Sequence, residues 1–207
     1  MKNPLHSLAC AAFLACAFST TAAAQFDEPA ARSKTRGVSL AAFVNGSAAA
    51  LEGSDEIDAG RGATLSLGYG FTDHVSVFAS VSGASVQPAS PAGADDYALA
   101  HADLGLRFSF ASPRAAVRPF VQAAVSGRAA SFDLGSEGML DIRGSGFTGG
   151  VGVAYFVSPR LALEAGLSYT VGKFGEGRLG GSDWVDLDDE ALEIDTSRFD
   201  LGLSWHP

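Results

Sequence analysis

From Gly37 to the C-terminus, the chain repeatedly places an apolar side chain at every second position. The clearest segment is LALEAGLSYTVG at 161–172, where large apolar residues alternate with Gly, Ser, Thr, Ala or Glu. Successive side chains of a β-strand point to opposite faces, so a period of two indicates a strand whose faces meet different surroundings. Eight such segments, apolar on one face and small or polar on the other, predict an all-β fold: an eight-stranded antiparallel up-and-down transmembrane β-barrel.

The predicted strands are separated by connections that alternate in length. The strands are expected at 38–45, 62–71, 75–82, 97–110, 117–126, 147–156, 161–172 and 196–205. The short connections are 72–74, 111–116 and 157–160, and the long polar ones are about 46–60, 83–96, 129–144 and 174–194. Outer-membrane barrels have short periplasmic turns and longer extracellular loops, so we expect both termini on the periplasmic side.

The same alternation is compatible with a soluble eight-stranded barrel or sandwich that turns its apolar face inward, as lipocalin-like barrels do. Two features argue against this alternative. The apolar face carries the bulkiest residues, too many for a small interior. The other face is rich in Gly, Ser, Ala and Thr with charges of both signs, which suits a narrow packed lumen.

The N-terminal residues 1–24 have the pattern of a signal peptide. Lys2 precedes an apolar run from Leu5 to Phe18, and Ala22–Ala24 form a small-residue cleavage site. A transmembrane anchor is the first alternative, but the run is shorter than the ~20 residues a spanning helix needs. A lipoprotein signal at Cys16 is the second, and the preceding Phe-Leu-Ala matches it poorly.

This division predicts a short periplasmic segment at 25–36 and a barrel domain at 37–207. Cys10 and Cys16 both fall within the predicted signal, so the processed chain would have no disulfide and no thiolate metal site. No later segment is apolar enough for a spanning helix, so the chain would cross a membrane as strands. A net charge of −9 without a basic patch argues against nucleic-acid binding.

The face opposite the apolar one carries ionisable residues that would meet inside the barrel. They are His101, Asp103, Arg107, Arg118, Glu164, Arg198 and Asp200. Isolated buried charges are costly, so these must pair. A network of Glu164 with Arg118 and neighbouring arginines would fill the interior and close the pore, because an eight-stranded barrel is just wide enough for side chains to fill. The alternative is a gate or a narrow solute path.

Two further groups of residues are candidates for interactions outside the lumen. An aromatic girdle at the periplasmic interface is predicted for Phe71, Phe108, Phe110, Tyr155, Phe156 and Trp205. The last long connection is acidic and is expected to be a solvated surface loop, with Trp184, Asp186, Asp188 and Asp189 as residues that would contact a partner. Its functional alternative is divalent-cation bridging to lipopolysaccharide, although the acids do not follow the order of an EF-hand loop.

The sequence predicts neither an enzyme nor a cofactor or metal site. A deacylase on such a barrel would need a His beside a Ser, and an acid that orients the His. After the predicted signal, the histidines are His74 in a turn, His101 and the near-terminal His206. His101 has no Ser two residues on. We therefore expect no catalytic residue.

Three stretches carry a resemblance to a known family. They are LSLGYGFTDHVSVFASV (65–81), RPFVQAAVSG (118–127) and LALEAGLSYTVGKFG (161–175). They resemble the small outer-membrane β-barrel superfamily of the OmpA transmembrane domain, OmpX, OmpW and opacity-type proteins. The resemblance implies a Gram-negative outer membrane, contact with its lipid and lipopolysaccharide, and insertion by the barrel-assembly machinery. Family members usually end on an aromatic residue, whereas here Trp205 is followed by His206 and Pro207.

The functional hypothesis is a structural or surface-interaction role through the long extracellular loops, around a polar and plugged lumen. A host or cell-surface molecule would be the partner. The competing hypothesis is a narrow pore for small solutes, as the resemblance to OmpW implies. The two differ in the lumen charges: paired and packed charges favour the first, and a continuous wet path favours the second.

Overall fold

The computed structural model describes residues 35–51, 56–89, 96–112, 114–187 and 192–207. The predicted signal peptide and nearly all of 25–36 therefore lie outside the described residues. The strands are β1 (Gly37–Leu51), β2 (Ile57–Gly70), β3 (Val75–Gln87), β4 (Tyr97–Ser109), β5 (Val117–Asp133), β6 (Met139–Ser158), β7 (Leu161–Leu179), β8 (Val185–Asp186) and β9 (Leu192–Trp205). A 3-10 turn, η2, covers Gly135–Glu137. No helix in this described part is long and apolar enough to cross a membrane.

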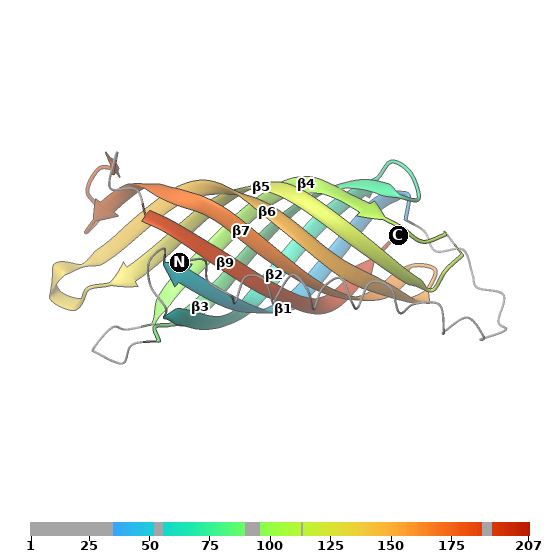
Figure 1. Cartoon of the computed structure of the whole chain (residues 1–207), viewed down its shortest axis with the longest axis horizontal. Coiled ribbons are helices and arrows are strands. Elements are labelled where there is room, and N and C mark those ends of the chain that lie inside the picture. Colours follow the sequence, from blue (N-terminus) through green and yellow to red (C-terminus); the bar gives the residue numbers. More distant parts are fainter. Residues whose placement is uncertain (1–34, 52–55, 90–95, 113, 188–191) are drawn as a thin grey trace, which may run out of the picture. The chain divides into compact units, whose positions relative to one another are not determined.

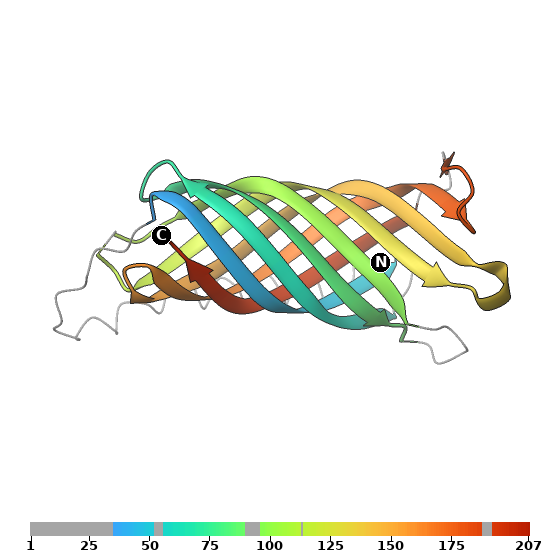
Figure 2. The ribbon, with the colours of Figure 1, turned by 180° about the vertical axis from the view of Figure 1, so that it is seen from behind.

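Eight long strands close into a barrel, as the alternating pattern predicts. Each strand from β1 to β6 pairs antiparallel with the next strand in the chain. The ring is closed by β9, which pairs with both β7 and β1. The two-residue β8 adds to β7 outside this ring. Figures 1 and 2 show the strands tilted strongly against the barrel axis. Closure leaves no free sheet edge, the condition a β-structure must meet to span lipid.

The side chains alternate in the orientation expected for a membrane barrel. Leu65 and Phe147 are 61% and 69% exposed, whereas their neighbours Thr64 and Thr148 are 6% and 4% exposed. Large apolar residues therefore form an outer belt while polar ones face the lumen. This arrangement excludes the lipocalin-like alternative, in which the apolar face would lie inside.

One end of the barrel has short turns, and we call it the short-turn end. A hydroxyl organises two of its turns. Thr72 accepts hydrogen bonds from the backbone N–H groups of His74 (3.1 Å) and Val75 (2.9 Å). Ser158 accepts from those of Arg160 (3.3 Å) and Leu161 (3.1 Å). Such side-chain turns compete well with extended backbone, which explains why the strands end sharply here.

The opposite end, which we call the hairpin end, differs from prediction. Much of the connections predicted at 46–60, 83–96, 129–144 and 174–194 is strand, and β6 begins at Met139 rather than at 147. The β5–β6 hairpin projects furthest from the barrel, opposite to the C-terminus (Figure 1). Beyond the apolar belt the outward-facing residues no longer form a large apolar row, and inward-facing residues such as Ala130 and Ile142 are apolar. The pattern of large apolar residues outside and small or polar ones inside therefore ends, although inward and outward positions still alternate and backbone pairing continues.

The predicted aromatic residues lie at the short-turn end, with one correction. Five of them are exposed on the outer face: Phe71, Phe108, Phe110, Tyr155 and Trp205. Phe156 instead turns inward, where its ring lies 5.3 Å from that of His206 and 5.8 Å from the guanidinium carbon of Arg118. The reason is the in–out alternation of β6: Tyr155 faces outward, so Phe156 faces inward and pairs in register with the buried Ala162 of β7. Phe156 therefore does not belong to a lipid-facing girdle.

Candidate functional site

The structure places all seven predicted lumen residues on the inner face of the barrel. His101, Asp103, Arg107, Arg118, Glu164 and Arg198 occupy inward positions of β4, β5, β7 and β9, and Asp200 follows on β9. Most of them belong to two ion-paired levels, which we call the lumen network.

The middle level of the lumen network is built around Asp103. Its carboxylate accepts hydrogen bonds from Arg198 Nη2 (2.7 Å) and from the Ser126 hydroxyl (2.5 Å). Arg198 Nη1 also donates to Ser82 (2.8 Å), so this one side chain links β9 to β3 and β4 across the barrel. Both members of the ion pair are about 95% buried. The additional hydrogen bonds to Ser82 and Ser126 offset part of the cost of burying this pair.

Hydroxyl and amide groups extend the middle level around the wall. Ser126 lies 2.5 Å from Thr148, which lies 2.7 Å from Thr170. On the other side, Thr64 donates to Asp200 (2.7 Å) and accepts from Asn45 (2.9 Å). The buried His101 has its Nε2 3.1 Å from the Thr196 hydroxyl.

The second level lies nearer the short-turn end and pairs Arg107 with Glu164. Arg107 Nη1 is 2.8 Å from Glu164 Oε2. The same guanidinium donates twice to Gln122 Oε1 (3.1 and 3.2 Å) and covers the Phe120 ring at 3.9 Å. The sequence predicts a network of Glu164 with Arg118 and neighbouring arginines. The ion pair of Glu164 is with one of those neighbours, Arg107, whereas Arg118 lies at the rim. β4 supplies the nearer arginine.

Arg118 binds two turns at the short-turn end. Its Nη2 donates to the backbone carbonyls of Asp73 (2.6 Å) and Ala111 (3.4 Å). The side chain thereby ties the β2–β3 turn to the β4–β5 turn. His206 lies beside this rim, with its backbone N–H donating to the Arg160 carbonyl (2.7 Å). Burial lowers the pKa of the His206 imidazole from its ordinary value. The charge of Glu164 opposes this shift, and those of Arg107 and Arg118 add to it.

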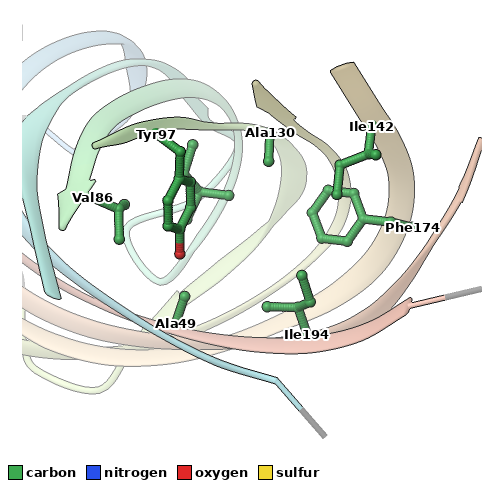
Figure 3. Packing of buried hydrophobic residues seen from close by; sticks show 8 residues of the cluster. Ala49, Val86, Tyr97, Ala130, Ile142, Phe174 and Ile194 are labelled. Carbon is green, nitrogen blue, oxygen red and sulfur yellow. The ribbon is translucent and has the colours of Figure 1, made fainter. Parts of the chain in front are cut away.

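The hairpin end of the lumen holds an apolar cluster that the sequence analysis did not identify. Its buried members are Ala49, Val86, Tyr97, Leu99, Ala130, Ile142, Phe174 and Ile194. Figure 3 shows seven of them pointing inward from the surrounding strands. Tyr97 stacks on Phe132 at 4.7 Å and donates its hydroxyl to Asp58 (2.9 Å). The available signal was the continued alternation of β3, β5 and β6 past the predicted strand ends.

Within the described residues, two cavities lie in the half of the lumen nearer the short-turn end. One, of about 60 Å³, lies at the short-turn mouth beside Arg118 and His206. The other, of about 40 Å³, lies between the two levels of the lumen network, beside Asp103 and Glu164. Both cavities have polar side chains in their lining and are large enough to hold water molecules.

At the hairpin end, Trp184 is packed between two arginines. Its ring lies 4.1 Å from the guanidinium carbon of Arg143 and 4.7 Å from that of Arg178. Each arginine also pairs with an acid, Arg143 with Glu176 and Arg178 with Asp141 (2.8 Å). Trp184 therefore fixes the chain leading into β8 against the β6–β7 hairpin.

The other residues predicted to contact a partner from this loop are Asp186, Asp188 and Asp189. Asp186 pairs in register with Glu176 within β8, and Asp188 and Asp189 lie outside the described residues. Asp141, beyond the apolar belt, accepts hydrogen bonds from Ser131 and Arg178, and these hold the pKa of its carboxyl below the ordinary value. In the described ranges, no group of three His, Cys, Asp or Glu side chains is placed to hold a metal ion.

These features agree with a comparison of sequences. The profile described as Outer membrane protein beta-barrel domain matches residues 8–206. The chain belongs to this family. Membership places the protein in the bacterial outer membrane, as the belt of exposed apolar residues requires. No curated protein sequence matches the chain.

Solved structures of other outer-membrane barrels share the family fold. Neisserial surface protein A is 19% identical, with a TM-score of 0.63, and the match covers 83% of this chain and 97% of that one. OprG from Pseudomonas aeruginosa is 14% identical, with a TM-score of 0.57 and coverages of 85% and 99%. Ail of Yersinia pestis is 16% identical, with a TM-score of 0.52 and coverages of 82% and 99%. At these identities the likeness concerns the fold alone.

Proposed function

We propose that this outer-membrane barrel is a closed scaffold that acts at the cell surface through its hairpin end. The observation that carries the proposal is that buried side chains meet inside the lumen at three successive levels. Arg107–Glu164 and Arg198–Asp103 form two of them, and the apolar cluster forms the third. Solute passage would require ion pairs to separate in a narrow interior and an apolar cluster to open.

The wall geometry supports closure. Arg107 reaches from β4 to Glu164 on β7, and Arg198 reaches from β9 to Ser82 on β3. Each of these contacts spans the interior rather than neighbouring strands. In a barrel of eight strands, side chains of this size take up the full width. The cavities of about 60 and 40 Å³ both lie on the short-turn side of the apolar cluster.

The hairpin end supports a role in surface interaction. β5, β6 and β7 continue as paired strands beyond the apolar belt, and Trp184 with its two arginines stiffens their outer side. A rigid projection loses little conformational entropy when a partner binds it. We propose a host or cell-surface molecule as that partner, lipid and lipopolysaccharide as the surroundings of the belt, and the barrel-assembly machinery as the partner during insertion.

The charge of the hairpin end restricts the class of partner. Ail has been crystallised with the heparin analogue sucrose octasulfate, a polyanion. In this chain the arginines of the projection already pair with Glu176 and Asp141, and Asp133 and Asp183 are exposed nearby. Repulsion of this acidic surface disfavours a polyanion. A neutral, cationic or cation-bridged partner fits this end better.

A planar-bilayer recording tests the closed lumen. The refolded, signal-free protein is expected to produce no discrete conductance steps, because two ion-paired levels and an apolar cluster stand in series. Circular dichroism and a shift in electrophoretic mobility on heating verify that the inserted protein is folded. Discrete steps whose size changes in Glu164→Ala would overturn the proposal in favour of a narrow pore.

Cysteine labelling tests which end faces outward. Both natural cysteines lie within residues 1–16, so a single introduced thiol reports its own position. In intact cells a membrane-impermeant maleimide is expected to label Ser136→Cys, at the tip of the β5–β6 hairpin, and to spare Ser112→Cys in a short turn. Both variants should react fully after lysis. The reverse pattern would place the hairpin end in the periplasm and exclude the surface role.

A further inference from the structure

One lumen arginine differs from the others in its surroundings. Arg128 lies on β5 directly opposite His101 of β4 and Gly144 of β6, and all three face inward. Gly144 is in turn opposite Phe174, a member of the apolar cluster. Arg128 therefore occupies the boundary between the middle level of the lumen network and the apolar cluster. It is 97% buried, since only 3% of its surface is exposed.

The planar guanidinium of Arg128 contacts an aromatic ring with its face, whereas the N–H groups at its edge have no hydrogen-bond partner among the described residues. Its central carbon lies 4.7 Å from the Phe174 ring, a cation–π distance. None of its three nitrogens, Nε, Nη1 or Nη2, has a hydrogen-bond partner among the described residues. The N–H groups of a guanidinium lie in its plane, so the edge is the part that binds a carboxylate or another anion. Aromatic stacking on the face leaves that edge available.

The carboxylates that interact with Arg128 at longer range are already engaged. Asp103 and Asp195 are the two acids whose charge it experiences. Asp103 binds Arg198 and Ser126, and Asp195 accepts a hydrogen bond from the Tyr169 hydroxyl. By contrast, Arg107 and Arg198 each bind a carboxylate directly, and Arg118 binds backbone carbonyls.

The wall next to Arg128 is tightly closed. A Cβ at its cross-strand neighbour Gly144 would lie 1.9 Å from the Lys173 carbonyl oxygen, and one at Gly146 would lie 2.3 Å from that of Val171, both backbone atoms of β7. A buried charged donor without a partner is strongly unfavourable, and native structures supply such groups with a counter-charge or a bound ligand. The unpartnered donors and the engaged acids indicate a ligand of opposite charge, and the close approach of β6 and β7 restricts it to a small ion.

We propose that Arg128 binds a small monovalent anion, of the size and charge of chloride, at the free edge of its guanidinium. The anion is taken up as the strands close and is sealed between the apolar cluster and the lumen network. It supplies the counter-charge that the chain itself does not provide. This site is distinct from the surface interaction proposed above and is independent of it.

The test compares the thermal unfolding midpoint of protein refolded into detergent micelles in sodium chloride and in sodium gluconate at equal ionic strength. An anion bound only by the folded state raises the midpoint, and a shift on the order of 4 °C in favour of chloride is expected for a barrel of this size. Gluconate is too large for the site. In Arg128→Met the two salts should give the same midpoint.

Arg61→Met is the matched control, because Arg61 points outward from β2 and is exposed. This variant loses the same charge and should keep the chloride response of the wild type. Crystals of the wild type grown in bromide provide a readout that needs no variant: an anomalous peak is expected within hydrogen-bond distance of the Arg128 guanidinium. Equal wild-type midpoints in the two salts, an unchanged chloride response in Arg128→Met, or no bromide peak at this position would each overturn the proposal.

Discussion

Asp103→Ala is expected to lower the free energy of unfolding by about 3–5 kcal/mol, as removal of one partner from a buried ion pair does. Asp103 accepts hydrogen bonds from Arg198 and Ser126 in the middle of the lumen. Its loss leaves the Arg198 guanidinium, 4% exposed, without a counter-charge. Urea titration of the barrel refolded into lipid vesicles, followed by tryptophan fluorescence, measures the change.

Glu176→Ala is the control for this prediction. It removes a salt bridge with Arg143 whose side chains are both more than 40% exposed, and such surface pairs contribute only about 0–1 kcal/mol. The double variant Asp103→Leu/Arg198→Met should recover much of the lost stability, because apolar groups can replace a buried pair. If Asp103→Ala proves as mild as Glu176→Ala, the middle level of the lumen network does not stabilise the barrel.

Gly202→Ala is expected to destabilise the barrel by about 3 kcal/mol, the upper end of the usual cost of overpacking. A Cβ at Gly202 would lie 2.0 Å from the Ala42 carbonyl oxygen and 2.6 Å from the Phe43 Cα, both backbone atoms of the neighbouring β1. Neither can move without displacing the β1–β9 pairing that closes the ring. The same urea titration reports the loss.

Gly149→Ala supplies the matched control for Gly202→Ala. Gly149 faces outward on β6, and a Cβ there meets nothing within 4 Å. Replacing this glycine restricts the unfolded chain without strain in the folded one, so a gain of about 0.5 kcal/mol is expected. The two substitutions should therefore differ in sign. Equal effects would mean that the close approach at β1–β9 does not require glycine.

Residues 161–172 illustrate how far the fold can be predicted from the chain. Lipid on one side and a polar lumen on the other impose opposite preferences on alternate residues, so β7 and its neighbours are evident from a period of two. This pattern of apolar and polar residues ends where the outer apolar belt of the barrel ends. Arg128 continues the inward series of Arg118, Gln122 and Ser126 on β5, yet it lies past the predicted end of that strand.

Which charged residues pair with one another is harder to predict from the sequence than which face of the strand they occupy. Alternation assigns Arg107, Arg118 and Glu164 to the inner face but says nothing of their height in the barrel. The stagger between neighbouring strands determines that height, and it brings Glu164 to Arg107 on β4 while leaving Arg118 at the rim. Trp184 is a similar case, since only the folded pairing of β6 with β7 brings Arg143 and Arg178 to its ring, at 4.1 and 4.7 Å.

The eight barrel strands, their closed antiparallel order and the residues that face the lipid can be predicted from the amino-acid sequence, because each follows from local alternation and connection length. The contacts across the lumen, the apolar cluster at the hairpin end and the isolation of Arg128 become evident only in the folded barrel. These depend on strand stagger and on the curvature of the wall, which bring together residues from opposite sides of the ring and which no local pattern encodes.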